Sequence, residues 1–321
     1  MAERILVTGA AGFIGSNLVE TLLKAGKLVT GVDNFDPFYS RTIKEHNIEN
    51  ALKDPGYHFE EGDIRDTEFI NNCFKTYGPD IIVHLAARAG VRPSLVDPHG
   101  YYDVNVMGTL NLLEEMRKNN IGKMIFASSS SVYGNNAKIP FCETDTVDYP
   151  ISPYAASKKA GELLCHTYHH LYKFDVFCLR FFTVYGKRQR PDLAIHKFTR
   201  ALLKDGLISL YGDGSSRRDY THIDDIIQGL MGAIRELKGF EIFNLGESAT
   251  ISLINLVSVL EKYTNKKARI KYLPIQKGDV IQTFADISKA RDKLNYNPVM
   301  DIETGIKMYV KDFITSDVLQ D

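Results

Sequence analysis

The sequence predicts an α/β fold in which a doubly wound parallel sheet carries a smaller C-terminal α/β lobe that binds substrate. Strand and helix patterns alternate through the first half, and a glycine-rich turn joins the first strand to the first helix. After about residue 180 the alternation loosens into shorter strands, loops and separated helices. Such alternation favours a parallel sheet with helices on both faces, and ligands bind beyond the carboxyl ends of its strands.

Short apolar runs predict the strands of the sheet, at residues 4–7, 27–32, 58–64, 81–87, 123–128 and 176–180. Helical spacing of apolar residues predicts helices between them, among others at 16–24, 105–118 and 155–172. A run at 240–245 predicts a strand that returns to the main sheet. We therefore expect a main domain over 1–180 with a returning segment near 220–248, and a lobe over 181–321.

The turn at residues 8–15 lies between the first strand and the first helix. This arrangement aims backbone N–H groups and the positive helix end at a phosphate, and its glycines are a close variant of the Gly-x-Gly-x-x-Gly fingerprint. The second strand ends at Asp33, where an acid accepts a ribose 2′-hydroxyl and repels a 2′-phosphate. An ordinary strand-to-helix turn is the alternative. The sheet is thus predicted to be Rossmann-type, with NAD rather than NADP as cofactor.

Bulk composition excludes several functional classes. The chain has 321 residues, 44% of them hydrophobic and 25% charged, with a formal net charge of −1. No basic excess points to nucleic acid, no apolar stretch approaches membrane-spanning length, and we expect no signal peptide. The cysteines lack metal-ligand spacing and are interpreted as reduced thiols of a cytoplasmic protein: Cys73, Cys142, Cys165 and Cys178. No metal is expected, because no carboxylate completes a ligand set with the helical histidines His166, His169 and His170.

The pair Tyr154 and Lys158 predicts acid–base chemistry. Pro153 fits a helix start, so the two side chains would sit one turn apart on one face. The ammonium of Lys158 and an oxidised nicotinamide would lower the pKa of Tyr154 from its usual value near 10. The tyrosinate could then take a proton from a hydroxyl while a hydride leaves for NAD. A surface tyrosine and lysine at helical spacing is the alternative.

A serine run at 128–131 follows the fifth predicted strand. Its hydroxyls would lie at the carboxyl end of that strand, where they can donate to a substrate oxygen. A polar loop that caps its own backbone is the alternative.

Together and in this order, these three motifs resemble the extended short-chain dehydrogenase/reductase family of NAD-dependent epimerases and dehydratases, over essentially the whole chain. The resemblance implies a catalytic triad of Ser129, Tyr154 and Lys158. It also implies a set of NAD contacts, in which 63–64 flank the adenine and 85–87 the phosphates and ribose on the nicotinamide side. The full set is Gly9, Gly12, Phe13, Ile14, Gly15, Asp33, Asn34, Asp63, Ile64, Leu85, Ala86, Ala87, Asn105, Tyr154 and Lys158.

Within the family, the 4,6-dehydratases place an Asp-Glu pair just after the catalytic hydroxyl residue. Ser130 and Ser131 stand there and cannot act as the acid and base that water elimination needs. The GDP-fucose synthase branch uses a cysteine in this loop, which this chain lacks. A sugar-nucleotide 4-epimerase or a decarboxylase remains.

Four segments resemble the UDP-glucuronate 4-epimerases: 89–92, 165–172, 180–186 and 190–192. Thr183 stands where UDP-galactose 4-epimerases usually carry asparagine, and with the serine run it offers short neutral donors for a C5 carboxylate. Packing beside the strand end is the alternative for Thr183. The chain departs from the subfamily at Pro93, usually tyrosine, and at Lys187-Arg188-Gln189, usually Pro-Trp-Gly.

Downstream, 212–222 resembles the family's diphosphate-binding stretch, with Arg218 as the matching arginine, and 276–279 the element that holds the uridine ribose. Lys277 stands where proline is common. A solvated charged loop is the alternative for Arg217-Arg218. The substrate contacts implied by the resemblance are Arg92, Ser129, Ser130, Ser131, Thr183, Arg190, Arg218 and Asp279.

The resemblance implies NAD-dependent 4-epimerisation of a UDP-sugar, UDP-glucuronate to UDP-galacturonate. Tyr154 would remove the 4-hydroxyl proton, C4 would give its hydride to resident NAD, and the 4-keto sugar would turn over before hydride returns. The alternatives are a UDP-glucose or UDP-N-acetylhexosamine 4-epimerase, then a UDP-glucuronate decarboxylase. An alternative of a different class is a non-catalytic NAD-binding regulator. The intact triad argues against it. The likeness also implies a homodimer through the helices around 102–118 and 155–172.

Overall fold

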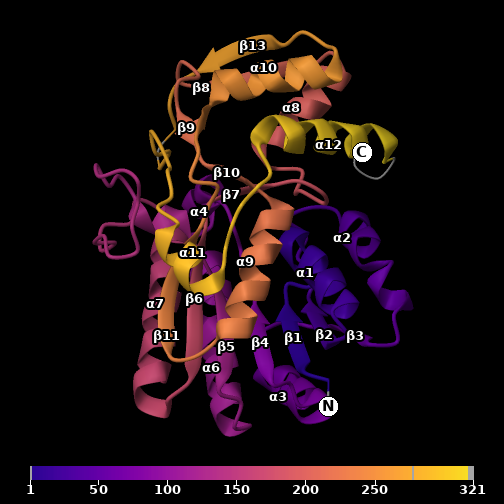
Figure 1. Cartoon of the computed structure of the whole chain (residues 1–321), viewed down its shortest axis with the longest axis vertical. Helices are drawn as coiled ribbons and strands as arrows, with labels where there is room; N and C mark the ends of the chain where they lie inside the picture. The colour runs from indigo at the N-terminus through magenta and orange to yellow at the C-terminus, as the bar shows by residue number, and fades with distance from the viewer. Residues whose placement is uncertain (1, 277, 317–321) are drawn as a thin grey trace.

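A seven-stranded parallel sheet organises the chain in the computed structural model, which describes residues 2–276 and 278–316 (Figure 1). The strand order is β11-β6-β5-β4-β1-β2-β3. The bounds are β1 (Arg4–Thr8), β2 (Leu28–Asp33), β3 (Tyr57–Glu61), β4 (Ile81–His84), β5 (Lys123–Ser129), β6 (Asp175–Phe181) and β11 (Phe240–Leu245). The predicted fold class is confirmed, and β11 returns to pair with β6.

The run predicted over 58–64 covers a strand and its exit, and the strand itself ends at Glu61. The strand predicted over 81–87 ends early, at His84. The residues that follow leave the ladder, because they turn along the carboxyl edge of the sheet and line a cavity there.

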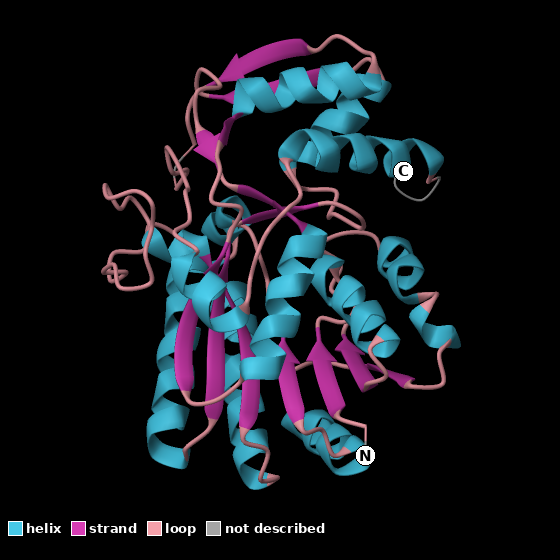
Figure 2. Ribbon diagram, viewed as in Figure 1, coloured by secondary structure: helices cyan, strands magenta, loops and turns pink. Residues whose placement is uncertain are grey.

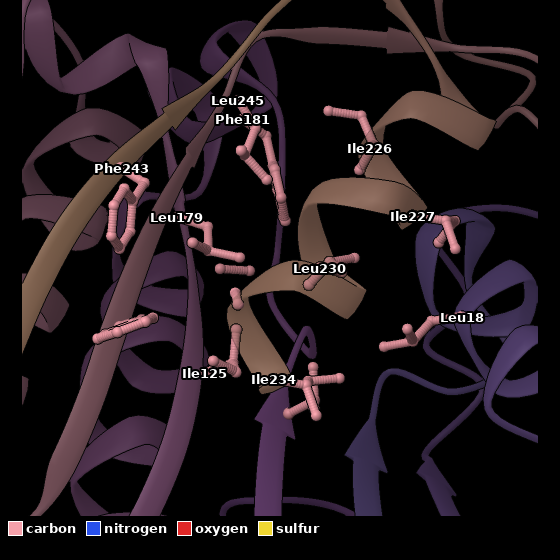
Figure 3. Packing of buried hydrophobic residues seen from close by; sticks show 14 of the residues in the cluster. Leu18, Ile125, Leu179, Phe181, Ile226, Ile227, Leu230, Ile234, Phe243 and Leu245 are labelled. Carbon is pink, nitrogen blue, oxygen red and sulfur yellow. The ribbon is translucent and has the colours of Figure 1, made fainter. Parts of the chain in front are cut away.

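Helices cover both faces of the sheet, as Figure 2 shows. One face carries α1 (Phe13–Lys24) and α9 (Ile223–Glu236), and the other carries α3 (Thr67–Tyr77), α6 (Gly108–Lys118) and α7 (Pro153–Tyr172). The apolar stripe of α9 packs on the sheet and on α1 through Leu18, Ile125, Ile226, Leu230 and Ile234 (Figure 3). The helix predicted over 105–118 is longer, because α5 (Pro98–Tyr102) and a π-helical turn at Asp103–Met107 precede α6 without a break.

The smaller lobe lies beyond the carboxyl ends of the strands (Figure 1). It comprises α8 (Ala194–Leu203), β8 (Leu207–Tyr211), α10 (Leu253–Thr264), β13 (Arg269–Leu273) and α12 (Ile302–Thr315). These elements share a separate apolar core that includes Ile195, Leu210, Leu256 and Tyr309. Short elements complete the chain: α2 (Arg41–Ile48), α4 (Val91–Val96), β7 (Thr183–Tyr185), β9 (Arg217–Arg218), β10 (Tyr220–His222), β12 (Ile251–Ser252), α11 (Ser288–Leu294) and 3-10 turns at Ala51–Lys53 and Ser130–Tyr133. Among the helices described, none combines the length and apolarity needed to cross a bilayer.

A buried ion pair ties α7 to the sheet. Arg180 on β6 binds Glu162 on α7 through two hydrogen bonds, Nε to Oε1 at 2.8 Å and Nη2 to Oε2 at 2.9 Å. The Ser128 hydroxyl on β5 donates to the same carboxylate at 2.6 Å, and Arg180 Nη1 donates to the Tyr133 hydroxyl at 2.9 Å. Both charged side chains are almost fully buried, at 1% and 2% exposure. Bidentate geometry and added hydrogen bonds are what such a pair needs to offset its desolvation.

We expect Arg180→Met to lower the free energy of unfolding by about 3–5 kcal/mol, because it leaves the Glu162 carboxylate buried without its partner. Urea denaturation measures the loss. The matched control is Lys262→Ala, which breaks an exposed 2.7 Å pair with Glu303 and should cost about 0–1 kcal/mol. Equal losses in the two variants would contradict a structural role for the buried pair.

Candidate active site

A cavity of about 800 Å³ opens at the carboxyl ends of β1, β2, β4, β5 and β6, between the sheet and the lobe. That volume is in the range of small-molecule and cofactor sites. Almost all the sequence-predicted site residues line it: Gly9, Gly12, Phe13, Ile14, Gly15, Asp33, Asn34, Asp63, Ile64, Leu85, Ala86, Ala87, Ser129, Ser130, Ser131, Tyr154, Lys158, Thr183, Arg190, Arg218 and Asp279. Arg92 and Asn105 are the exceptions.

The glycine turn forms a cradle that side chains would fill. Gly9 has a φ of +71°, and a Cβ on it would lie 2.8 Å from the Ala86 nitrogen. A Cβ on Gly15 would lie 2.1 Å from the Gly9 carbonyl oxygen. Helix α1 begins directly after Gly12, whose position carries no side-chain cap. The first-turn amides and the positive end of α1 therefore suit a phosphate group, and the cradle fits a dinucleotide diphosphate.

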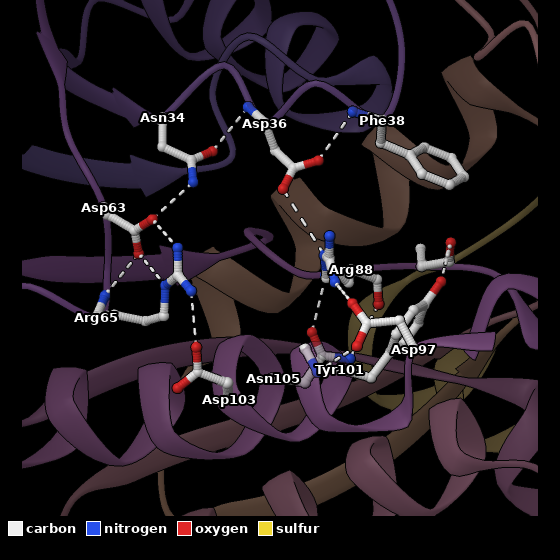
Figure 4. A network of polar contacts seen from close by, with 12 residues as sticks. Asn34, Asp36, Phe38, Asp63, Arg65, Arg88, Asp97, Tyr101, Asp103 and Asn105 are labelled. Atoms are coloured by element: carbon white, nitrogen blue, oxygen red, sulfur yellow. Dashed lines mark hydrogen bonds and ion pairs between the residues drawn. The ribbon is translucent and has the colours of Figure 1, made fainter. Parts of the chain in front are cut away.

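Acidic side chains follow β2 and β3 on the flank of this cradle. Asp33 ends β2 and accepts hydrogen bonds from the Ala11 amide at 3.1 Å and the Phe35 amide at 2.9 Å. Burial raises the pKa of Asp33, whereas the nearby Lys44 ammonium lowers it. Asp63 accepts from Asn34 at 2.8 Å and pairs with Arg65, which lowers the pKa of Asp63 to about 2 (Figure 4). This negative flank suits the free hydroxyls of a ribose better than a ribose phosphate.

Tyr154 and Lys158 lie on successive turns at the start of α7. Ser152 caps this helix by accepting a hydrogen bond from the Ala155 amide at 3.1 Å, as the predicted helix start requires. Beside them β5 ends at Ser129, whose hydroxyl accepts from the Ser131 amide at 3.2 Å and the Ser131 hydroxyl at 2.9 Å. The fold thus brings the phenol, the amine and the serine run into one wall of the cavity.

Within the fold itself, Lys158 is not among the groups that lower the pKa of Tyr154. The contribution expected from an oxidised nicotinamide stays a prediction. Burial raises the pKa of Tyr154, and a hydrogen bond with Ser129 and the positive charge of Arg190 oppose that rise. Lys158 instead donates to the Ala127 carbonyl on β5 at 2.7 Å, and burial lowers its own pKa to about 8. The reason is that α7 packs closely on β5, so the amine reaches the strand's backbone.

Arg190 is the arginine of the cavity wall beside Tyr154. Its guanidinium pairs with Asp192 at 2.7 Å and lies 5.3 Å from the Phe38 ring centre. It also donates to the Ala89 carbonyl at 3.4 Å. Sequence reasoning assigned Arg190 to substrate and did not foresee its proximity to Tyr154.

Arg218 is a cavity-lining cation that forms no ion pair within the described residues. Its Nη1 donates to the carbonyls of Arg217 and Ile281 at 2.9 and 3.3 Å, and burial lowers its pKa. A guanidinium in this setting suits an anionic ligand such as a diphosphate.

Two predicted contacts lie outside the cavity wall. Arg92 pairs with Asp279 at 2.7 Å, and its guanidinium lies 3.9 Å from the Tyr211 ring centre. Asn105 lies behind the wall, where its amide accepts from the Arg88 nitrogen at 2.8 Å and donates to the Arg88 carbonyl at 2.9 Å. Both side chains are held by protein partners, and neither is among the residues that line the cavity.

Sequence reasoning missed Lys44, Asp36 and Arg88, which all line the cavity. Lys44 is buried and donates to the Asp36 carbonyl at 2.6 Å. Asp36 and Lys44 are charged residues among other polar residues, and Arg88 stands between alanines. None of the three carries a local signal, so only the fold could have found them.

The helical histidines His166 and His169 take part in aromatic packing. The rings of His166 and His169 pack against Phe240, with centroids 5.0 and 5.8 Å apart. Across residues 2–276 and 278–316, no three His, Cys, Asp or Glu side chains gather in a way that could hold a metal ion.

Comparison with known proteins adds four findings. Residues 6–309 match the family described as GDP-mannose 4,6 dehydratase. The chain is 45% identical to the UDP-glucuronate 4-epimerase of Thermodesulfobacterium geofontis, covering 95% of this chain and 94% of that protein. It is 38% identical, with a TM-score of 0.91, to the UDP-glucuronic acid 4-epimerase from Bacillus cereus in complex with UDP-glucuronic acid and NAD, covering 96% and 98% of the two chains. A dTDP-glucose 4,6-dehydratase from Streptomyces venezuelae with NAD bound is 29% identical, with a TM-score of 0.92 and coverages of 98% and 99%.

We expect Lys158→Met to raise the free energy of unfolding at pH 7 by about 1–3 kcal/mol, because the variant no longer buries an amine whose charged form is disfavoured. The pKa of Lys158 is about 8 in the fold against 10.5 ordinarily, so between these values the unfolded chain binds more protons. Wild-type stability therefore rises with pH across that window, and the advantage of the variant shrinks there. Urea denaturation of ligand-free wild type and variant, at both ends of this pH window, measures the difference in stability.

The control is Lys159→Met on the same helix, which should change stability by less than about 1 kcal/mol because that side chain is partly exposed. A Lys158→Met variant less stable than wild type at pH 7 would overturn the assignment of an energetic cost to this amine.

Proposed function

We propose that this chain, which belongs to the GDP-mannose 4,6-dehydratase family, is an NAD-dependent UDP-glucuronate 4-epimerase that interconverts UDP-glucuronate and UDP-galacturonate. One observation carries the proposal: Ser129, Tyr154 and Lys158 share a cavity in which the neighbouring positions carry hydroxyls, not carboxyls. Relatives of this description that match nearly the whole chain support it.

The family includes dehydratases, and the fold does not separate the two activities. Elimination of water needs a carboxyl acid and base beside the reacting carbons. Ser130 and Ser131 follow Ser129 in the 3-10 turn and supply neither. The residues after β5 therefore favour epimerisation.

The cavity fits NAD by its shape and charge. The glycine cradle of 9–15 holds the diphosphate, Asp33 accepts the adenosine ribose hydroxyl, and 85–87 line the nicotinamide side. NAD bound there would supply the hydride acceptor for C4 of the sugar, and the hydride donor for its return.

The protein's own groups bind the sugar nucleotide and move its proton. Arg218 takes the diphosphate and Asp279 the uridine ribose, so the UDP group stays anchored while the sugar turns. Tyr154 takes the proton of the 4-hydroxyl and later gives it back, and the Ser129 hydroxyl donates to the oxygen at C4. The positive charge of Arg190 favours the phenolate form of Tyr154 in this exchange.

The hydroxyls of Ser130, Ser131 and Thr183 hold the C5 carboxylate. The 4-keto intermediate is a β-keto acid, which loses CO₂ when its C–COO bond stands perpendicular to the carbonyl plane. Hydrogen bonds that keep the carboxylate out of that orientation protect the intermediate, and Thr183 begins β7 at the edge of the cavity.

Three broader assignments accompany this function. Residues 1–180 with the returning α9 and β11 hold NAD, and 181–321 mainly hold the UDP-sugar. The four free cysteines support a cytoplasmic location. Exposed apolar side chains on the helices around 102–118 and 155–172 support a homodimer: Tyr102, Met107, Leu163 and Leu171.

Purified protein without added NAD should convert UDP-glucuronate to UDP-galacturonate, because the reaction has no net redox change and the cofactor stays bound. Chromatography of the nucleotide sugars measures it. Formation of UDP-pentose and CO₂ would indicate a decarboxylase. Turnover of neutral UDP-hexoses alone would indicate a different epimerase, and bound NAD without any turnover would indicate a regulator.

Two variants test the assigned residues. Tyr154→Phe should retain fold and nucleotide binding but lower kcat by about 10²–10⁴-fold, the usual share of acid–base catalysis. Thr183→Val removes one hydroxyl and keeps a side chain of similar size. This variant should raise the proportion of UDP-pentose product. Full activity of Tyr154→Phe would contradict the proton-transfer role of Tyr154. An unchanged product ratio in Thr183→Val would contradict the contact between Thr183 and the carboxylate.

Sedimentation should find a dimer that Leu163→Glu dissociates, because a buried carboxylate is strongly disfavoured in an apolar interface. Leu52→Glu, an exposed leucine on another part of the surface, is the control and should leave the dimer intact. A monomeric wild type would refute the dimer.

A further inference from the structure

A side-chain ion pair crosses the dinucleotide cradle. In the sheet β1 lies between β4 and β2, and the glycine turn follows β1. Arg88 lies in the segment after β4, and Asp36 lies in the segment after β2. Their side chains meet, with Arg88 Nε and Asp36 Oδ2 3.7 Å apart (Figure 4). The pair therefore joins the two segments that flank the cradle, and both residues line the cavity.

Both ends of this pair are anchored to the protein. The main chain of Arg88 is bound in both directions by Asn105, and its guanidinium also contacts Asp97, which accepts from the Gly100 amide at 3.0 Å to cap α5. Asp36 accepts from the Phe38 amide through Oδ1 at 2.9 Å. Other contacts therefore hold both side chains near each other, and only their mutual contact has to break for the crossing to open.

The position and the partial exposure of this pair suit a contact that opens and closes reversibly. The Arg88 and Asp36 side chains are 32% and 29% exposed. Partly exposed pairs are individually weak and are screened by salt, so this one opens readily. A weak crossing lets a ligand enter the cradle and still delays its escape.

We propose that Arg88, through its pair with Asp36, retains NAD in the cradle between turnovers. The inference rests on the proposed function, because an epimerase returns its hydride and gains from a cofactor that never leaves. Arg88 is a retention residue here and takes no part in proton transfer. The result is a slow dissociation step set by a side-chain pair outside the catalytic triad.

The test measures NAD release from the holoenzyme in the absence of any sugar. Wild type, Arg88→Ala, Asp36→Asn and the double variant are freed of unbound nucleotide, diluted, and sampled over time for protein-bound NAD. Asp36→Asn keeps an oxygen for the Phe38 amide and removes only the charge. Each single variant should release NAD about 3–10-fold faster at low salt, and the double variant no faster than Arg88→Ala, because the two residues act as one pair.

Salt dependence separates a pair from a general loosening of the fold. Release from wild type should accelerate between low salt and about 0.5 M salt, whereas release from the variants should not, because only the intact pair is screened. Arg88→Lys should restore part of the retention, since it keeps the charge. Arg235→Ala, which breaks an exposed pair with Glu236 on α9, is the matched control and should match wild type.

Unchanged release in Arg88→Ala or in Asp36→Asn, with NAD still bound, would overturn the retention proposal and leave the proposed function standing. A wild-type protein that binds no NAD would overturn both. If NAD release depended equally on salt in wild type and variants, the pair would not be the cause of the retention.

Discussion

The bidentate pair of Glu162 and Arg180 is the interaction on which the geometry of the site depends. Glu162 lies one turn beyond Lys158 and two turns beyond Tyr154 along α7, so the pair fixes the helix that carries both groups. Its carboxylate also binds Ser128, the neighbour of Ser129 on β5. One buried charge pair therefore sets the distance between the two halves of the proposed triad. Apolar packing alone, which is not directional, would leave the helix freer to slide.

Burial acts in opposite directions on the two titratable groups of α7. It raises the pKa of Tyr154 and lowers that of Lys158, so it disfavours the charged form of each. The phenol is thus kept protonated until positive charge approaches, and the neighbouring Arg190 supplies part of that charge. A buried phenol with a cation beside it suits the proposed chemistry, which takes a proton and gives it back.

Fold and activity are set by different parts of this chain. A dehydratase and an epimerase match it almost equally well, with TM-scores of 0.92 and 0.91. The sheet, the cradle and α7 are shared architecture, whereas the few side chains after β5 and at the start of β7 differ in chemistry. By the family resemblance, Ser130 and Ser131 stand at the positions of the acid–base pair that elimination requires. Thr183 stands at the position of an asparagine in UDP-galactose 4-epimerases. Function in this family has to be argued from such positions.

The sequence by itself determined the parallel α/β class, the glycine cradle, Asp33 at the end of β2, and Tyr154 and Lys158 one turn apart. Each follows from local periodicity or turn chemistry, which a short window of residues contains. Tertiary structure decided that Arg92 and Asn105 bind protein partners outside the cavity lining, and that Arg88, Asp36 and Lys44 form part of it. It also decided the directions of the pKa shifts at 154 and 158. The physical reason is that burial and ion pairing depend on partners such as 36 with 88 and 162 with 180, which only the folded chain brings together.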